Sequence, residues 1–188
     1  ETELSALGQA KYENAQTKAA AVKAKWEELI DSGKVGYMAL MRNLRNIMEA
    51  NVSAAHMKKV CDYLASEKAV AGSKQLPFRF LAAYREVKVL KSEYVTVVLN
   101  ALEDAVAASV KNLKGFDAST RVLIACDVSG SMQKAVSAKS KVMMFDIGLM
   151  LGMLMQSKCQ RVVSSMFGDT WKIINMPNRN VLANVEQY

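Results

Sequence analysis

A short stretch in the second half of the chain, RVLIACDVSGSM (residues 121–132), joins a run of apolar residues to an aspartate and two serines. Asp127, Ser129 and Ser131 stand at alternate positions, so in an extended turn their oxygens can point the same way, and Gly130 lets the backbone bend between them. One carboxylate and two hydroxyls are hard oxygen donors of the kind that Mg²⁺ binds while it keeps several of its waters. The local chemistry favours a divalent-cation site and a helix cap about equally.

Two other chemistries of a serine-rich loop fit this stretch less well. A hydrolase elbow needs glycine two positions before and two positions after its serine, but Ser131 is preceded by Ser129 and followed by Gln133. The chain has one histidine, His56, and it lies far from the loop, in a segment that reads as a helix. A phosphate-binding loop would need more glycines and a lysine in register. We therefore expect no enzymatic activity.

The segments around this loop predict an α/β unit. Residues 121–126 read as a buried strand, residues 137–157 as a helix, and residues 159–167 and 170–175 as two further strands. Strand, helix and strand in that order imply a parallel pair, and the short FGDT link implies an antiparallel third strand. The loop then lies at the carboxyl end of the first strand, where ligands collect in such folds, and the helix from about Ser137 could donate amides to an anionic ligand. One face of this sheet has no helix to cover it, so we expect the unit to continue past Tyr188.

The first part of the chain predicts helices only. Apolar residues recur at steps of three and four over residues 5–32, 35–50, 51–66, 77–91 and 92–113, with Gly33 and Gly115 as stops and Ser53 and Ser92 as caps. Successive short amphipathic helices are typical of an α-solenoid built from helix pairs. We place this helical part over residues 1–117 and the α/β part over residues 118–188.

Composition excludes some classes of protein. The longest apolar run, residues 143–155, contains Asp146 and is shorter than the roughly 20 residues that span a bilayer, so we expect no membrane anchor. The three widely spaced cysteines predict reduced, buried thiols in a cytoplasmic protein. The formal charge of +7 is spread over the chain, +3 up to Thr120 and +4 beyond it, and it suits nucleic acid, an acidic membrane surface or an acidic protein as partner.

Several segments together resemble a known family. YMALMRNLRNI, VCDYLASEKAV and LPFRFLAAYREVK are similar in kind and order to the TROVE domain of the Ro ribonucleoprotein autoantigen and its bacterial relatives. DVSGSM after an apolar strand resembles the D-x-S-x-S signature of the von Willebrand factor type A fold, which follows the helical ring in that family. The resemblance covers most of residues 26–169.

The resemblance implies both a fold and a function. The fold is part of an α-solenoid of HEAT-like repeats followed by the start of a Rossmann-like type A domain. The function is RNA quality control, in which the ring takes the 3′ end of misfolded small RNA and also binds Y RNA. A metal-ion-dependent adhesion site for Mg²⁺ or another divalent cation is implied, with Asp127, Ser129 and Ser131 as ligands. The threonine and later aspartate that complete the family's site have no match here, and the family's ring is larger than residues 1–117 can build.

RNA binding requires cations that follow the phosphates and planar groups on which bases stack. The candidates are the pair Arg42 and Arg45, within one turn, and the stripe Arg85, Lys88 and Lys91, at steps of three. The alternative is that these residues form solvated helix faces whose aliphatic stems cover apolar neighbours. A second hypothesis is a protein-interaction module in which a cation at Asp127 bridges to a partner's carboxylate. The expected partners are thus a small noncoding RNA or, through the metal site, a protein.

Overall fold

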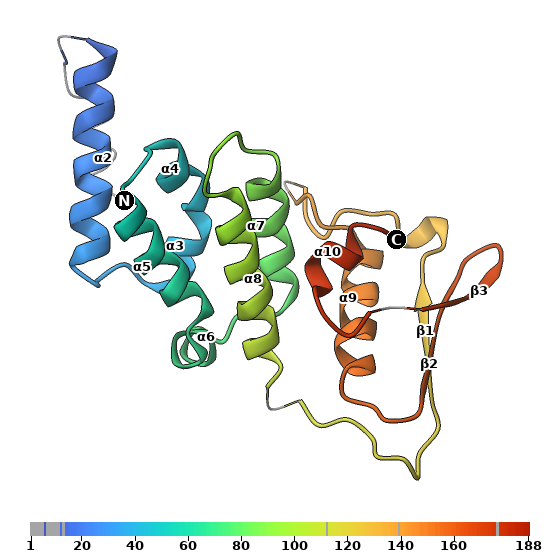
Figure 1. Cartoon of the computed structure of the whole chain (residues 1–188). Helices are drawn as coiled ribbons and strands as arrows, with labels where there is room; N and C mark the ends of the chain where they lie inside the picture. The colour runs from blue at the N-terminus through green and yellow to red at the C-terminus, as the bar shows by residue number, and fades with distance from the viewer. Residues whose placement is uncertain (1–5, 7–11, 13, 112, 139, 176) are drawn as a thin grey trace.

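The computed structural model describes Ala6, Tyr12 and residues 14–111, 113–138, 140–175 and 177–188. Seven helices, α2 to α8, come first in the described residues, and three strands with two further α-helices follow; α2 lies at one side of the molecule, α7 and α8 in the middle and the strands at the other side (Figure 1). The helices are α2 (Ala15–Asp31), α3 (Tyr37–Arg42), α4 (Leu44–Glu49), α5 (Ala54–Ala65), α6 (Glu67–Ser73), α7 (Phe78–Lys88), α8 (Val95–Ser109), α9 (Met144–Gln156) and α10 (Val181–Val185), and the strands are β1 (Val122–Asp127), β2 (Val162–Phe167) and β3 (Trp171–Ile174). The predicted combination of a helical part with a small α/β part is confirmed.

The predicted helix over residues 35–50 is two helices in the structure, α3 and α4. Asn43 separates them, with φ −102° and ψ 9°. Its side-chain amide donates a hydrogen bond of 2.8 Å to the carbonyl oxygen of Ala39, four residues earlier. Side chains that bond to the backbone in this way offer it an alternative to regular helix. The bend places Arg42 and Arg45 on two different helices, although they are three residues apart.

The other predicted helices are present with altered ends. The helix expected over residues 5–32 corresponds to α2, which begins at Ala15 and is capped by Asn14. Most of the positions before Asn14 lie outside the described residues. Ser53 caps α5 as predicted, by accepting a hydrogen bond from the amide of His56. The short helix α6 was not predicted; Ser66 caps it. The helix α8 ends at Ser109, before the expected stop at Gly115.

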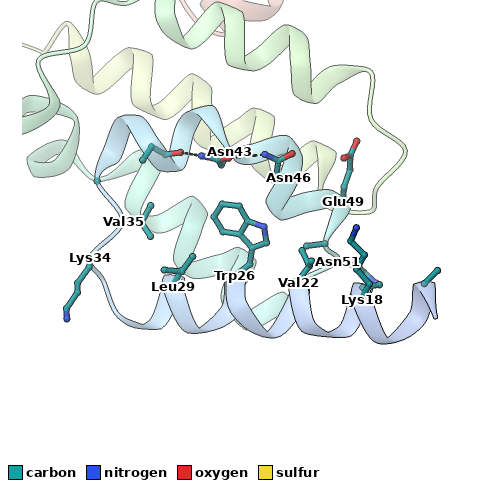
Figure 2. A pocket seen from close by; sticks show the side chains of 15 residues that line it. Lys18, Val22, Trp26, Leu29, Lys34, Val35, Asn43, Asn46, Glu49 and Asn51 are labelled. Carbon is teal, nitrogen blue, oxygen red and sulfur yellow. Dashed lines mark hydrogen bonds between the residues drawn. The ribbon is translucent and has the colours of Figure 1, made fainter. Parts of the chain in front are cut away.

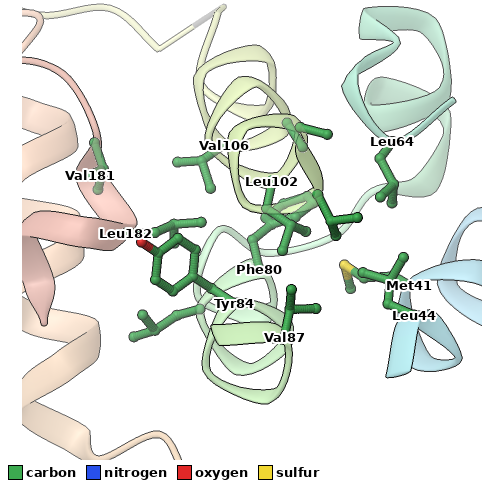
Figure 3. Close-up of a cluster of buried hydrophobic side chains, with 14 of the residues drawn as sticks. Met41, Leu44, Leu64, Phe80, Tyr84, Val87, Leu102, Val106, Val181 and Leu182 are labelled. Atoms are coloured by element: carbon green, nitrogen blue, oxygen red, sulfur yellow. The ribbon is translucent and has the colours of Figure 1, made fainter. Parts of the chain in front are cut away.

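The core runs through α7 and α8 and reaches both parts of the chain (Figure 3). Phe80 and Leu102 are fully buried between these helices, and Leu64 of α5 packs on one side of them. On the other side Leu182 of α10 is fully buried beside Tyr84. Because α10 comes from the end of the chain, the α/β part shares its apolar core with the helical part.

The sheet has the predicted topology. β1 and β2 are parallel, with Val122 opposite Val162, and β2 and β3 are antiparallel, with Phe167 opposite Trp171. The crossover helix α9 packs against β1 and β2. The predicted start of this helix near Ser137 is wrong, because a bridge between residues 135 and 143 closes a loop and α9 begins only at Met144. The loop after β1 instead contains a short 3₁₀ helix, Gly130–Met132, which Ser129 precedes.

The face of the sheet opposite α9 is open. Leu123 of β1 and Ile173 of β3 are 62% and 73% exposed, and Val163 between them is also exposed. The register of the strands places these three side chains on one face. Within the described residues nothing covers this face, as the strand and helix count predicted.

The link between the two parts contains a close backbone approach at Gly115. A Cβ atom at this position would lie 1.7 Å from the carbonyl oxygen of Lys158, just past the end of α9. We expect Gly115→Ala to lower the free energy of unfolding by about 1–3 kcal/mol, because the added methyl group forces this backbone contact apart. Denaturant unfolding measures the change. Gly72→Ala in α6 is the matched control, since a Cβ there meets nothing within 4 Å and alanine favours the helix. Equal stability of Gly115→Ala and wild type would contradict the expected contact.

The cysteines are free, as predicted. Cys61 and Cys126 are buried and Cys159 is half-buried. Burial raises the pKa of the Cys61 thiol to about 11, so this thiol stays protonated near neutral pH. Among the described residues, none of the helices is both long enough and apolar enough to span a bilayer.

Candidate functional site

A hollow of about 320 Å³ lies between the bent pair α3 and α4 and the helix α7. Three arginines line it, Arg42 at the end of α3, Arg45 in α4 and Arg79 in α7. Its remaining lining is mostly apolar and is formed by Met38, Met41, Leu44, Ala82 and Ala83, together with Asn46 and Glu86. The structure thus brings together the predicted pair Arg42 and Arg45 and adds Arg79, which the sequence analysis missed.

The three guanidinium groups differ in how far their charge is balanced. Arg42 and Arg79 are exposed, and neither has an ion-pair partner in the part of the chain that the structure describes. Arg79 lies over the ring of Phe78, with 5.6 Å from Cζ to the ring centroid. Arg45 donates a hydrogen bond of 2.8 Å to Glu49, which raises the pKa of Arg45, and the charge of Glu86 acts in the same direction. Two of the three charges are therefore free to meet an anionic ligand.

The predicted stripe Arg85, Lys88 and Lys91 does not form one surface. Arg85 is mostly buried, and its guanidinium donates to both carboxylate oxygens of Asp146 in α9, at 2.6 and 2.9 Å, and to Glu186 at 2.6 Å. Lys88 also pairs with Glu186, at 3.1 Å. Lys91 lies exposed after the end of α7, with no ion pair among the described residues. Since the donors of Arg85 are engaged by carboxylates, the geometry gives this residue a role in joining the two parts of the chain, and its RNA contact stays an unsupported prediction.

This junction has further hydrogen bonds of the same kind. Arg85 donates to the carbonyl oxygen of Lys141, and Asp146 accepts from the amide of Met143 at the start of α9. In α8 the carboxylate of Glu103 accepts from the amides of Leu182 and Ala183 at the start of α10. Burial raises the pKa of Glu103, while these amides act to lower it. The helical part thus holds both α9 and α10 by charged side chains.

The pH dependence of stability should reflect this junction. Burial raises the pKa of Glu186, but the hydrogen bonds from Arg85 and Lys88 outweigh it, and the net pKa lies below the ordinary 4.5. A carboxylate with a lowered pKa in the folded state stabilises the fold above its unfolded pKa, and this contribution is lost as the pH falls through the folded value. We expect the free energy of unfolding to fall more steeply in wild type than in Glu186→Gln between about pH 5 and about pH 3.

Denaturant unfolding across that range measures the two slopes. Glu93→Gln, which changes an exposed carboxylate before α8, serves as the control and should keep the wild-type slope. A Glu186→Gln slope equal to that of wild type would show that the Glu186 pair does not stabilise the fold.

Asp127, Ser129 and Ser131 are brought together in the loop after β1, as predicted. The amide of Ser129 donates to Oδ1 of Asp127 at 2.9 Å, and the two serine hydroxyl oxygens are 3.1 Å apart. These hydrogen bonds from Ser129 lower the pKa of Asp127, so its carboxylate stays charged at neutral pH. Asp127 therefore accepts a hydrogen bond within its own loop, and its carboxylate can also serve as a metal ligand. The geometry agrees with both the helix-cap and the cation-site interpretation.

A hollow of about 370 Å³ adjoins this loop and is shared with the turn between β2 and β3. Ser129 and Gly130 line it from one side, and Asp169 and Thr170 from the other. Asp169 was not predicted from the sequence, although β2 runs parallel to β1 and must end at the same edge of the sheet. The described residues contain no group of three or more His, Cys, Asp or Glu side chains placed to hold a metal ion. A cation at the loop after β1 would be bound by one carboxylate, that of Asp127, and by the hydroxyl groups of Ser129 and Ser131.

A larger hollow, about 1070 Å³, lies on the other side of α3 and α4, against α2 (Figure 2). Trp26, Val22 and Leu29 of α2 form its apolar wall, and Asn43 and Asn46 face it from the bend, where Asn46 donates to Asn43 at 2.9 Å. Lys18, Lys34 and Glu49 stand at its rim, so its charge is mixed. The smaller arginine hollow is the better candidate for an anionic ligand because two of its three arginines have no ion-pair partner among the described residues.

Comparison with known proteins supports a family assignment for the helical part. Residues 9–97 match the model of the TROVE domain. A stretch of 68 residues is 46% identical to telomerase protein component 1 of Mus musculus and, equally, of Rattus norvegicus. This stretch is 36% of the chain but only 3% of each relative, so the chain corresponds to a small part of those proteins. The match at residues 9–97 supports the resemblance of the helical part to the TROVE family.

Proposed function

We propose that the protein is an RNA-binding component of a ribonucleoprotein and that RNA contacts it at the arginine hollow between α3, α4 and α7. The observation that carries this proposal is the convergence of Arg42, Arg45 and Arg79 on one apolar hollow, with Arg42 and Arg79 unpaired among the described residues. Guanidinium groups bind phosphate oxygens with two parallel hydrogen bonds and also stack on bases. Both properties suit single-stranded RNA, whose bases are accessible.

The family supports a more specific form of this proposal. The resemblance to the Ro autoantigen suggests that the RNA is a small noncoding, Y-like RNA or the 3′ end of a misfolded RNA, in cytoplasmic quality control without a catalytic step. The telomerase protein component 1 relatives are, by their name, components of an assembly. In this proposal the helical part is a portion of a HEAT-like solenoid, and residues 118–188 begin a von Willebrand factor type A domain.

Binding of three RNAs of equal length to the full chain tests the proposal. The RNAs are a hairpin with a free single-stranded 3′ tail, a longer-stemmed hairpin of the same total length with a blunt end, and an unstructured strand. We expect the tailed hairpin and the unstructured strand to bind at least about tenfold more tightly than the blunt hairpin, because bases buried in a duplex cannot stack on arginine. Equal or absent binding of all three would refute the proposal.

A second candidate function is a protein-interaction module that uses a cation to bridge to a partner's carboxylate. The observation that favours it is the gathering of Asp127, Ser129 and Ser131 beside the hollow that Asp169 also lines. These oxygen donors fit Mg²⁺, which would supply a positive charge for an acidic side chain of the partner. A pull-down with and without chelator, comparing wild type with Asp127→Ala, tests it. A partner that is retained under all these conditions would refute it.

The affinity of the chain alone for Mg²⁺ should be weak. Only one carboxylate stands among the predicted ligands, and ligand charge sets affinity at such sites. We expect a dissociation constant of about 1 mM or higher by calorimetry, weakened further in Asp127→Asn. Asp117→Asn, an exposed aspartate in the linker that closes a similar local turn, is the control. Stoichiometric binding at micromolar Mg²⁺ would contradict this expectation.

A further inference from the structure

The arginine hollow has the size of a site for one small ligand. At about 320 Å³ it lies at the lower end of the range in which proteins bind small molecules. It is too small to hold a helix of nucleic acid. A strand could therefore insert a single nucleotide into it while the neighbouring nucleotides stay outside.

The lining of the hollow fits the parts of one nucleotide. Met38 and Met41, from α3, and Ala82 and Ala83, from α7, give it apolar walls against which a base can lie, and methionine sulfur packs well on aromatic rings. Arg79 already stacks on Phe78, and a guanidinium can stack on a base with its other face. Arg42 and Arg45 supply charge for the phosphates on either side of that base.

One residue in the hollow has the wrong sign for a phosphate. Glu86 of α7 lines it, with its side chain 39% exposed. Its Oε1 pairs with Lys141 at 2.6 Å, and this is its only ion pair within the described ranges. A carboxylate among arginines repels a bare phosphate or an acidic peptide, but it accepts hydrogen bonds from the donor edge of a base. Guanine presents two such donors side by side, at N1 and N2, whereas uracil presents one and adenine an amino group alone.

We propose that this hollow is a subsite for one unstacked guanosine nucleotide of single-stranded RNA, in which Glu86 accepts hydrogen bonds from the Watson–Crick edge of the base and Arg42 and Arg79 hold the adjoining phosphate and the ring. This inference rests on the proposed RNA-binding function and specifies which nucleotide the site prefers. Arginine provides affinity for any sequence, and Glu86 provides the preference. Because affinity and guanosine preference come from different residues, we expect that substitutions can change each of them separately.

The test uses the full chain and labelled RNAs of about eight nucleotides, a typical site size for a single-stranded RNA module. All positions are uridine except a central guanosine, inosine, adenosine or uridine. Fluorescence anisotropy should show guanosine binding about tenfold more tightly than uridine, with inosine between them because it lacks the N2 amino group. Glu86→Gln should reduce the guanosine preference to below about threefold and leave affinity for the all-uridine strand within about threefold of wild type.

Two further variants separate the subsite from its surroundings. Lys141→Met removes the ion pair with Glu86 and should keep the guanosine preference. Ala83→Leu fills the hollow and should abolish the preference, whereas Ala107→Leu, on the exposed side of α8, should not. Thermal unfolding confirms that each variant folds.

The outcomes distinguish the inference from the proposed function. Salt-sensitive binding with equal affinity for guanosine and uridine strands would overturn the guanosine subsite and leave RNA binding intact. A guanosine preference that survives Glu86→Gln would overturn the role of Glu86 and with it the subsite. Absence of binding to every RNA would refute the proposed function itself.

Discussion

Replacing Arg85 by methionine is expected to lower the free energy of unfolding by about 3–5 kcal/mol, the range for removing one partner of a buried ion pair. The carboxylate of Asp146 is fully buried and would lose both hydrogen bonds from the guanidinium. Glu186 would lose its bond to Nε at the same time. Methionine keeps much of the aliphatic stem, so the loss reports on charge more than on packing. Denaturant unfolding at neutral pH measures it.

Two comparisons identify the cause of this loss. Lys88→Met removes a half-exposed charge that also pairs with Glu186, and it should cost less than about 1 kcal/mol. Adding Asp146→Asn to Arg85→Met removes the stranded charge while an amide oxygen can still accept from Met143, so the double variant should be more stable than Arg85→Met alone. If Arg85→Met and Lys88→Met were equally mild, the junction between α7, α9 and α10 would not depend on this ion pair.

Changing Arg42, Arg45 and Arg79 together to glutamine is expected to weaken binding of single-stranded RNA by about one to two orders of magnitude at roughly 0.1 M salt. Three cations that line one hollow would be lost, while the exposed side chains leave the core unchanged. Fluorescence anisotropy measures the affinity, and circular dichroism checks that the helices remain.

The matched control removes the same charge elsewhere. Lys68, Lys114 and Arg121 are exposed, outside the hollow, and without an ion pair in the described part of the chain. Their triple change to glutamine lowers the formal charge of +7 by three, as the first triple does. It should weaken binding by no more than about threefold, through the general field of the protein. Equal losses in the two triple variants would show that net charge, and not the hollow, governs affinity.

The elements with a strong period were predictable from the sequence. The apolar runs of β1 and β2, with a helix between them, specify a parallel pair, and Ser53 marks the start of α5. The features that the local sequence patterns did not predict depend on the hydrogen bonds of single residues. The amide of Asn43 bends one predicted helix into two, and the bridge between Ala135 and Met143 comes directly before α9.

The candidate site was predictable only in part, for a similar reason. Arg42 and Arg45 are close in sequence, and their proximity was visible in it. Arg79 and Glu86 line the same hollow from α7. Their position there depends on the packing of α4 against α7, which the spacing of residues in the sequence does not predict. The stripe of Arg85 and Lys88 has the spacing of an exposed face, but α9 and α10 cover it with Asp146 and Glu186. Burial by a segment about 60–100 residues later, as the separations of those pairs show, cannot be read from helical periodicity.

The salt dependence of RNA affinity tests whether RNA binds at the arginine hollow. The affinity of the full chain for an unstructured strand is measured over a series of salt concentrations, for wild type and for the triple variant of Arg42, Arg45 and Arg79. Each phosphate contact on a single strand contributes about −0.7 to the slope of log affinity against log salt, so three arginines should contribute about −2. We predict a steep negative slope for wild type that becomes shallower by up to about 2 in the triple variant. Identical slopes in the two proteins, or no measurable affinity in wild type, would contradict RNA binding at this hollow.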